Sequence, residues 1–304
     1  MFKIHCLMRS ISLSSPFSSS PLLPIQIPSL MEAHLWYLIP DEINNSSLLN
    51  RYMDILSPCE KDKVLSIKES KQQKIALLSR SLARTTLARY YAGQNVQPKS
   101  FKFKKNKYGK PELECEHDGF QLHFSISHTS SLIACGISSN SHIGIDVEEK
   151  ERQIKSDVLR LAHRYFSRQE VCHLRKISTP ENQRKEFIKL WTLKEAFVKA
   201  LGTGFSAMPF KTFTIHLKAT SPNVYEHYEI VAEPPELLKA SKRRWDLVVL
   251  EAEGRHYVSV CRERDEHSEE CIKYSVRKTI PFVNDEVISS SDRIRCIGCT
   301  PINF

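Results

Sequence analysis

The fold is decided by the stretch Ile143-Gly144-Ile145-Asp146-Val147-Glu148. Its apolar residues alternate with Gly144, Asp146 and Glu148, and a period of two predicts a β-strand. Successive side chains on a strand point to opposite faces, so Asp146 and Glu148 share one face and lie about 6.6–6.8 Å apart. Gly144 leaves room on that face for a ligand or another piece of backbone.

A second stretch with acidic and basic residues is predicted to lie on a helix, Trp191-Thr192-Leu193-Lys194-Glu195-Ala196-Phe197-Val198-Lys199. Thr179-Pro180 supplies an N-cap followed by proline at the first helical position. Gly202 comes just after the last apolar residue, where helices commonly end. Glu195 and Lys199 are four residues apart and therefore share a face. The apolar residues at helical spacing are Phe187, Leu190, Trp191, Val198 and Leu201.

Two interpretations of these carboxylates are open. In one, Glu195 and Lys199 form a surface ion pair worth about 0.3–0.5 kcal/mol, and Asp146 and Glu148 lie on a solvated strand face. In the other, Asp146, Glu148 and Glu195 converge. Charges about 4 Å apart then repel by about 1 kcal/mol in water and about 4 kcal/mol at an effective dielectric constant of 20. Carboxylates without histidine or cysteine favour Mg²⁺, or Mn²⁺ as its substitute, and a magnesium ion so held points to a polyphosphate ligand.

Positive charge and hydroxyl groups precede the acidic strand. A lysine run, Lys102, Lys104, Lys105 and Lys107, leads into a predicted turn at Tyr108-Gly109-Lys110-Pro111. Alternating apolar residues then predict a strand that ends at Ser127-His128, with a second strand returning over residues 132–137. A basic run is usually a solvated face, and a histidine at a strand end is more often a hydrogen-bonding partner than a catalyst.

Two further basic segments lie near the start of the chain. The capping-box pattern Ser57-Pro58-Cys59-Glu60 predicts a helix start, and that helix carries Lys61 and Lys63. The next predicted helix carries four basic residues, Lys74, Arg80, Arg84 and Arg89. From the sequence alone, anion binding by these residues is not separable from ordinary surface charge.

Four of these segments, in this order, resemble the larger, pseudo-dimeric class of 4′-phosphopantetheinyl transferases, the surfactin-synthetase-activating type. They are Gly109-Lys110-Pro111, Phe124-Ser125-Ile126-Ser127-His128, Gly144-Ile145-Asp146-Val147-Glu148 and Trp191 to Lys199, and the likeness extends over residues 35–262. The resemblance implies an enzyme that moves the phosphopantetheine arm of coenzyme A to a serine of an apo acyl carrier protein. Such an enzyme releases adenosine 3′,5′-bisphosphate, and the resemblance implies that the modified carrier is used in fatty acid biosynthesis.

The resemblance also implies roles for residues of the acidic site. Asp146, Glu148 and Glu195 match the family's Mg²⁺ positions, and Lys199 matches the lysine that contacts the phosphates. The carrier serine attacks the β-phosphorus of the pyrophosphate, so catalysis requires positioning and charge neutralisation. Glu195 is the candidate base for the serine, directly or through a metal-bound water, and Lys199 adds a cation.

The remaining coenzyme A contacts follow from the same resemblance. Ser127 and His128 match the pocket around the nucleotide and its phosphates, and Lys110 with Lys105 matches the preceding loop. Lys63 is a looser match to a basic residue against the 3′-phosphate. Ser125 stands where relatives commonly have Asn, which is expected to change a local hydrogen bond without abolishing binding.

The organisation of the chain suggests an internal duplication. Residues 120–137 predict one hairpin and residues 245–262 another, each after helical and basic segments. We therefore expect an α+β fold of two pseudo-symmetric halves, 32–142 and 143–262, in agreement with the pseudo-dimer of the family. Coenzyme A is expected in the cleft between the halves of a monomer.

Residues 1–31 differ from the body. The first thirty are rich in Ser and Pro, contain no Asp or Glu, and include two basic residues, Lys3 and Arg9. This composition favours a transit peptide, with a mitochondrial destination expected and a plastid as the alternative. A disordered leader, with Met31 as the start of a cytosolic form, is the other interpretation. No apolar run is long enough to span a bilayer.

Residues 263–304 are polar and charged and are expected to form a disordered tail. The tail ends in Cys296-Ile297-Gly298-Cys299, but one CxxC without a second pair is a weak sign of metal or redox function. The chain has nine cysteines without framework spacing, and in the absence of a secretion signal we expect reduced thiols.

The net charge of +9 fits an acidic partner such as an acyl carrier protein. The basic residues from Arg160 to Lys176 are expected to contribute to its docking. Two alternatives remain. One is an organellar nucleic-acid-binding protein, because lysines interleave with Phe101, Phe103 and Tyr108. It gives no reason for the carboxylates, so no nucleic-acid partner is expected. The other is a catalytically inactive relative that acts as a binding module.

Overall fold

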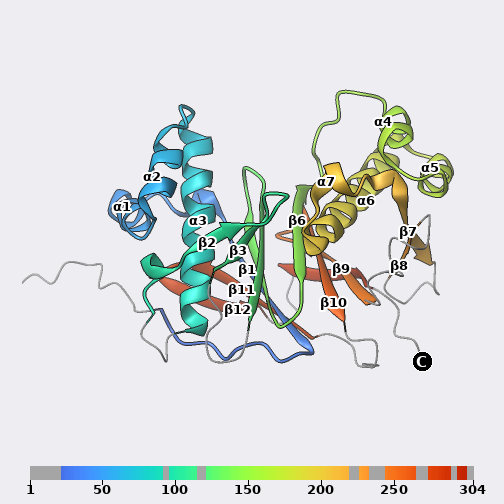
Figure 1. Cartoon of the computed structure of the whole chain (residues 1–304). Helices are drawn as coiled ribbons and strands as arrows, with labels where there is room; N and C mark the ends of the chain where they lie inside the picture. Colours follow the sequence, from blue (N-terminus) through green and yellow to red (C-terminus); the bar gives the residue numbers. More distant parts are fainter. Residues whose placement is uncertain are drawn as a thin grey trace, which may run out of the picture.

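The computed structural model of the chain describes residues 22–91, 96–114, 121–218, 226–232, 244–264, 273–288 and 293–299. Two groups of helices stand side by side over β-strands, with β6 between them (Figure 1). The first-half elements are β1 (Glu32–Leu38), η1 (Pro40–Glu42), α1 (Ser46–Asp54), α2 (Pro58–Leu65), α3 (Ser70–Tyr90), η3 (Pro98–Ser100), β2 (Phe103–Lys105), β3 (Pro111–Leu113), β4 (Leu122–His128) and β5 (Ile133–Ser139).

The second half begins with β6 and repeats the same succession of a strand, three helices and a hairpin. Its elements are β6 (Ile143–Glu149), α4 (Val158–Tyr165), α5 (Arg168–Arg175), α6 (Pro180–Leu201), α7 (Gly204–Ala207), η4 (Phe210–Thr212), β7 (Phe213–Lys218), β8 (Glu226–Ala232), β9 (Arg244–Ala252) and β10 (His256–Arg264). Three more strands follow, β11 (Lys273–Ile280), β12 (Asn284–Ile288) and β13 (Ile294–Cys299).

The sheet topology shows the duplication. One sheet has the order β12-β11-β1-β5-β4 and the other β6-β10-β9-β13-β8-β7, so β1-β5-β4 in the first corresponds to β6-β10-β9 in the second. In both sets the neighbouring strands are antiparallel. The predicted α+β fold of two pseudo-symmetric halves is confirmed.

Matching buried ion pairs hold the helices of each half together. Ser57 and Ser167 begin α2 and α5 with capping boxes that end in Glu60 and Glu170. Glu60 accepts from Arg84 of α3 at 2.6 Å, and Glu170 accepts from Lys194 of α6 at 2.8 Å. The same sequence spacing separates Glu60 from Glu170 and Arg84 from Lys194, so the pairs occupy equivalent places. Arg84 and Lys194 are therefore scaffold residues, each fully enclosed.

Three apolar clusters make up the described core. One lies around α3 and includes Trp36 of β1, and a second lies around α6. The third joins the strand faces that are turned away from the helices, with Leu35 and Tyr37 of β1 and Ile145 and Val147 of β6 among its members. Because side chains alternate along a strand, Gly144, Asp146 and Glu148 of β6 face α6.

The expectation of a disordered tail over residues 263–304 is wrong for its described part. Strand β11 pairs with β1 in parallel from Glu32↔Lys273 to Tyr37↔Lys278, and β12 extends the same sheet. Strand β13, which contains Cys296 of the CxxC, pairs with β9. The polar composition misled the prediction because backbone pairing holds these strands in the sheets: β11 lies between β1 and β12, and β13 lies between β9 and β8. Few of their described side chains, such as Val276 and Ile294, are buried.

Of the two interpretations of residues 1–31, the disordered leader does not hold for residues 22–31. Leu22, Ile25 and Ile27 pack against the cluster around α3, and the amide of Ile25 donates to the carbonyl oxygen of Arg89 at 3.0 Å. The rest of this segment, on which the transit-peptide interpretation depends, lies outside the described residues. Among the described residues, no helix has the length and apolarity needed to cross a membrane.

Candidate active site between the two halves

The site is built where α6 lies directly on β6. A Cβ atom at Gly144 would come within 2.0 Å of the carbonyl oxygen of Ala196 and 2.2 Å of the amide nitrogen of Ala200. Only glycine therefore allows this close contact of helix and strand. The contact places Asp146 and Glu148 of the strand beside Glu195 and Lys199 of the helix.

Asp146 is the centre of the site. Its side chain is 8% exposed, and its Oδ1 accepts from Lys199 Nζ at 2.6 Å and from Ser127 Oγ at 2.9 Å. Lys199 Nζ also donates to Ser127 Oγ at 3.0 Å. Asp146 Oδ2 is buried without a hydrogen-bond partner among the described residues. Such an oxygen is costly to bury, so it is available for a ligand.

Glu148 and Glu195 both bind protons more tightly than ordinary glutamates. Burial raises the pKa of Glu148 to about 7, and the charge of Asp146 adds to the rise while Arg152 opposes it. Burial and the charge of Asp146 also raise the pKa of Glu195, against the opposing charge of Lys199. Asp146 acts on both glutamates, so the three predicted carboxylates share one electrostatic environment.

The carboxylates fit a divalent cation but do not form a ready coordination shell. No group of three or more His, Cys, Asp or Glu side chains that could hold a metal ion occurs among the residues the structure describes. Asp146 Oδ1 already forms an ion pair with Lys199, and Glu148 already forms one with Arg152. The donors are nevertheless all oxygen, and Asp146 Oδ2 is free. A hard cation would relieve the cost of ionising Glu148 and Glu195.

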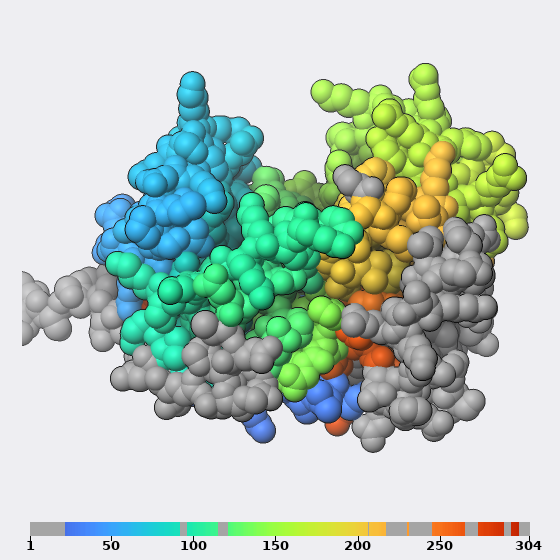
Figure 2. Space-filling view, viewed as in Figure 1, coloured from blue at the N-terminus to red at the C-terminus, as the bar shows by residue number. Residues whose placement is uncertain are grey.

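A cleft of about 280 Å³ lies against this group at the seam between the halves. Its lining comes from the turn of the first half, from β4 and from α6, and comprises Tyr108, Gly109, Lys110, Pro111, Phe124, Ser125, Ile126, Glu195, Val198, Lys199, Gly202 and Gly204. Figure 2 shows a hollow between the two helical lobes at the top of the molecule. The structure thus brings Lys110, Glu195 and Lys199 to one cleft.

Strands β4 and β6 meet along this seam. The amide of Ile145 donates to Ser125 Oγ at 3.1 Å, so the serine at the position where Asn was expected bridges the two sheets. Lys110 Nζ donates to the carbonyl oxygen of Ile143 at 2.9 Å. Burial lowers the pKa of Lys110 to about 8. Lys110 therefore holds the turn against β6 through its side chain.

His128 lies exposed at the end of β4, one residue after Ser127. Partial desolvation by the surrounding protein lowers the pKa of His128, and the charges of Lys199 and of Arg80 lower it further. Arg80 lies on α3 of the first half, so both halves direct positive charge to this place. The sequence left anion binding by Arg80 open against ordinary surface charge, and no motif linked Arg80 to His128 because the two residues lie on elements that are distant in the chain.

Of the predicted coenzyme A contacts, Lys110 and Lys199 line the cleft, whereas Ser127, His128, Lys63 and Lys105 are not among its described lining residues. Ser127 reaches the cleft through its hydrogen bond with Lys199. Lys63 on α2 and Lys105 at the end of β2 are exposed, and neither is among the described residues that line it. Their placement follows from local sequence, since both point outward from short elements at the surface. A role for either against a phosphate stays a prediction.

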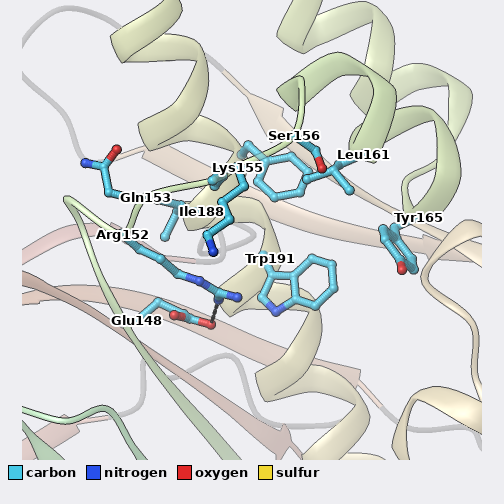
Figure 3. A pocket seen from close by; sticks show the side chains of 11 residues that line it. Glu148, Arg152, Gln153, Lys155, Ser156, Leu161, Tyr165, Ile188 and Trp191 are labelled. Atoms are coloured by element: carbon cyan, nitrogen blue, oxygen red, sulfur yellow. Dashed lines mark hydrogen bonds and ion pairs between the residues drawn. The ribbon is translucent and has the colours of Figure 1, made fainter.

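A second pocket of about 270 Å³ lies on the other side of Glu148. Figure 3 shows Arg152 extended to Glu148, with Trp191 beside this pair and Lys155 above it. The aromatic wall continues with Tyr165, whose ring meets that of Trp191 edge to face at 5.5 Å. Glu148 therefore lines an aromatic, partly basic pocket, while its charge interacts with those of Asp146 and Glu195.

Comparison with known protein families identifies relatives for both halves. A model of the 4′-phosphopantetheinyl transferase superfamily matches residues 142–261. A model described as the N-terminal part of 4′-phosphopantetheinyl transferase matches residues 44–140. The two matched segments meet between β5 and β6, where the structure passes from one half to the other.

Individual proteins show the same similarity. The chain is 32% identical over 168 residues to the 4′-phosphopantetheinyl transferase gsp of Aneurinibacillus migulanus, covering 54% of this chain and 66% of that protein. It is 32% identical over 167 residues to the transferase Sfp of Bacillus subtilis strain 168, covering 55% and 69%. It is 31% identical over 192 residues to the transferase HetI of Nostoc sp., covering 63% and 76%.

Proposed function

This chain belongs to the 4′-phosphopantetheinyl transferase family, and we propose that it transfers the phosphopantetheine group of coenzyme A to a serine of an apo acyl carrier protein. The observation that carries the proposal is the contact of Lys199 with Asp146 and Ser127 at a cleft between the halves. A cation, a buried carboxylate and a hydroxyl from both halves meet there. These groups could hold a pyrophosphate beside a bound metal ion.

The proposed reaction is a displacement at phosphorus. The carrier serine oxygen forms a bond to the β-phosphorus of coenzyme A, the bond from that phosphorus to the bridging oxygen breaks, and adenosine 3′,5′-bisphosphate leaves. Lys199 and His128 lie where negative charge on the pyrophosphate oxygens would be stabilised. Mg²⁺ held by Asp146, Glu148 and Glu195 would supply further charge neutralisation when bound.

Glu195 is proposed to take the proton of the serine hydroxyl. It lines the cleft beside Lys199, and its raised pKa makes its carboxylate a stronger base than an exposed glutamate. A base whose pKa lies closer to neutral pH removes a hydroxyl proton more effectively. Glu195 would also be an oxygen donor to the cation, whose charge would lower this pKa again.

The carrier is proposed to dock on the basic helices of the second half. Five basic residues there are exposed: Arg160, Arg164, Arg168, Arg175 and Lys176. They follow the second pocket along α4 and α5, close in sequence to its lining residues Lys155 and Tyr165. An acidic carrier would be attracted to this face by long-range electrostatics.

The chain is proposed to act as a monomer in a mitochondrion. The composition of the first thirty residues supports import into a mitochondrion, with plastid or cytosol as alternatives. Both walls of the cleft come from one chain, which supports a monomer as the working unit.

The test incubates the purified chain with coenzyme A, Mg²⁺ and an apo acyl carrier protein, followed by intact-mass measurement of the carrier. The expected result is a carrier heavier by one phosphopantetheine group. A carrier with its acceptor serine changed to alanine is the control and should gain nothing.

Glu195→Gln should slow the transfer by about 10²–10⁴-fold. Transfer that proceeds at the parent rate would remove Glu195 from the mechanism. Complete absence of transfer by the parent chain, together with salt-sensitive binding to a random oligonucleotide, would favour the nucleic-acid alternative.

A further inference from the structure

The turn between β2 and β3 belongs to the first half but is attached to the second half at two points. We propose that Asn106, a residue outside the motifs discussed above, is a positioning residue that clamps this turn to α6 and so sets the cleft for coenzyme A. The inference rests on the proposed function for its ligand. In Figure 2 the green stretch that contains the turn reaches across the front of the molecule to the amber stretch that contains α6.

The first role of Asn106 is to shape the turn. Its Oδ1 accepts from the amide of Tyr108 at 2.9 Å and from the amide of Lys110 at 3.0 Å. Its own backbone closes the turn, because its amide donates to the carbonyl oxygen of Lys110 and its carbonyl oxygen accepts from Gly109. Gly109 has a φ of 91°, which favours glycine. One oxygen of Asn106 therefore organises the wall of the cleft.

The second role of Asn106 uses its other side-chain atom. Its Nδ2 donates to the carbonyl oxygen of Gly202 at 2.8 Å. Gly202 ends α6 with a φ of 70°, and a Cβ there would lie 2.9 Å from that same Nδ2. The carbonyl groups at a helix end need partners from outside the helix. Asn106 supplies one from the opposite half, only three residues after Lys199.

Lys110 makes the second attachment. Its Nζ donates to the carbonyl oxygen of Ile143, at the start of β6. The turn therefore contacts both elements that carry the acidic site, α6 at its end and β6 at its beginning. Tyr108, Gly109 and Lys110 also line the cleft opposite Glu195 and Lys199. The distance between the two walls is consequently fixed by these two contacts.

Asn106→Asp separates the two roles. An aspartate keeps an oxygen for the amides of Tyr108 and Lys110, but it places an oxygen instead of a donor against the carbonyl group of Gly202. We expect the dissociation constants for coenzyme A and adenosine 3′,5′-bisphosphate, measured by calorimetry with Mg²⁺, to rise about tenfold. The Michaelis constant for coenzyme A should rise equally, and kcat at saturating coenzyme A should be retained.

The matched control is Asn140→Asp. Asn140 Oδ1 accepts from the amide of Gln121 within the first half, away from the cleft, and the substitution adds the same charge. It should leave both dissociation constants unchanged. Lys110→Met is the second variant, to be used if Asn106→Asp does not fold, and it should weaken coenzyme A binding in the same way.

Hydrogen exchange gives a reading that does not depend on coenzyme A. The amides of Gly202 and Thr203 donate to carbonyl groups of the last turn of α6, and both should exchange faster in Asn106→Asp than in Asn140→Asp. Parent-like exchange there, or parent-like affinity for coenzyme A, would overturn the clamp. Failure of the parent chain to bind coenzyme A, with faster exchange in the variant, would refute the proposed function and leave the clamp standing.

Discussion

The two halves of the molecule build the same strand-and-helix unit and use its inner face differently. In the first half, Trp36 and Leu38 of β1 face α3 and are part of a closed apolar cluster. In the second half, Asp146 and Glu148 of β6 face α6 from the corresponding strand. The two halves share a topology, and the residues at a few equivalent positions decide whether strand and helix enclose an apolar core or a candidate active site.

The helices show the same contrast. Arg89 lies five residues after Arg84, as Lys199 lies five after Lys194. Arg89 is 1% exposed and forms a bidentate pair with Asp285 of β12, whereas Lys199 is 30% exposed at the cleft. A fully paired, enclosed arginine contributes to folding, while a lysine at an open cleft is available to a substrate. Four predictions break or sharpen this comparison.

The largest effect is expected from Lys199→Met. Removing the cation at the cleft should lower kcat/KM for the transfer by about 10³-fold, because a preorganised charge at a phosphoryl group is lost. The melting temperature should fall as well, because Asp146, whose side chain is 8% exposed, loses its ion-pair partner. Mass measurement of the carrier over time tests the expected loss of activity, and thermal unfolding tests the expected melting temperature. Retained activity would show that Lys199 lies outside the reaction.

The equivalent change in the first half, Arg89→Met, should act on stability instead. It leaves Asp285, which is partly buried, beside a methionine, and breaking a pair with one enclosed partner costs about 3 kcal/mol in the free energy of unfolding. Denaturant unfolding measures the loss. The kcat of the folded fraction should stay near the parent value. A strong loss of kcat with unchanged stability would contradict the assignment of this half as scaffold.

The free energy of unfolding should depend on pH differently in the Glu148→Gln variant and in the parent protein. Its folded pKa of about 7 lies above the usual 4.5, so between these values the folded state holds a proton that the unfolded state has lost. Stability therefore falls as pH rises through this window, and the loss is complete above about pH 7. With discount for partial exposure, Glu148→Gln should gain about 2 kcal/mol at pH 8 and nothing at pH 4.

Unfolding of parent and Glu148→Gln between pH 4 and pH 8 in a chelating buffer tests this expectation. Chelation matters because a bound cation would offset the cost of ionising Glu148. Leu38→Met, at the corresponding place in the first half, is the control and should leave the pH dependence as in the parent. Identical pH profiles for Glu148→Gln and the parent protein would show that ionising Glu148 does not lower the free energy of unfolding.

The smallest effect is expected at the carrier surface. Changing Arg164 and Arg168 to Glu should raise the Michaelis constant for an acidic carrier about tenfold, and more at low salt, without changing that for coenzyme A. The matched change on the first half is Lys61 and Lys63 to Glu, which should leave the carrier constant unchanged. Equal increases in the Michaelis constants for the carrier and for coenzyme A would contradict a specific role of these arginines in carrier docking.

Several features of the site were predictable because they depend on local pattern. The alternation over residues 143–148 predicted that Asp146 and Glu148 share a face, and β6 spans that stretch. The spacing of Glu195 and Lys199 predicted a shared helix face, and α6 spans both. Ser57-Pro58 and Thr179-Pro180 predicted helix starts that the structure places there. Periodicity and capping depend on neighbours within a few residues, which the sequence displays directly.

Other features were beyond such patterns. The tail was expected to be disordered, yet β11 lies beside β1 and Asp285 pairs with Arg89. The sequence did not separate anion binding by Arg80 from surface charge, and the structure couples its charge to His128. Asn106 carried no motif, yet it reaches Gly202. In each case the partner is distant in the chain. The periodicity of a strand or helix does not indicate which distant element will pack against it.

The sequence by itself determined the elements, the faces that carry charge and the repetition of a strand, three helices and a hairpin. Only the tertiary structure decided that Gly144 lets α6 lie against β6, that Asp146 is buried with one oxygen free, and that Lys110 and Asn106 attach the first half to the second. The physical reason is that short-range preference sets local conformation, whereas burial, charge coupling and contact between halves arise only once the chain is packed.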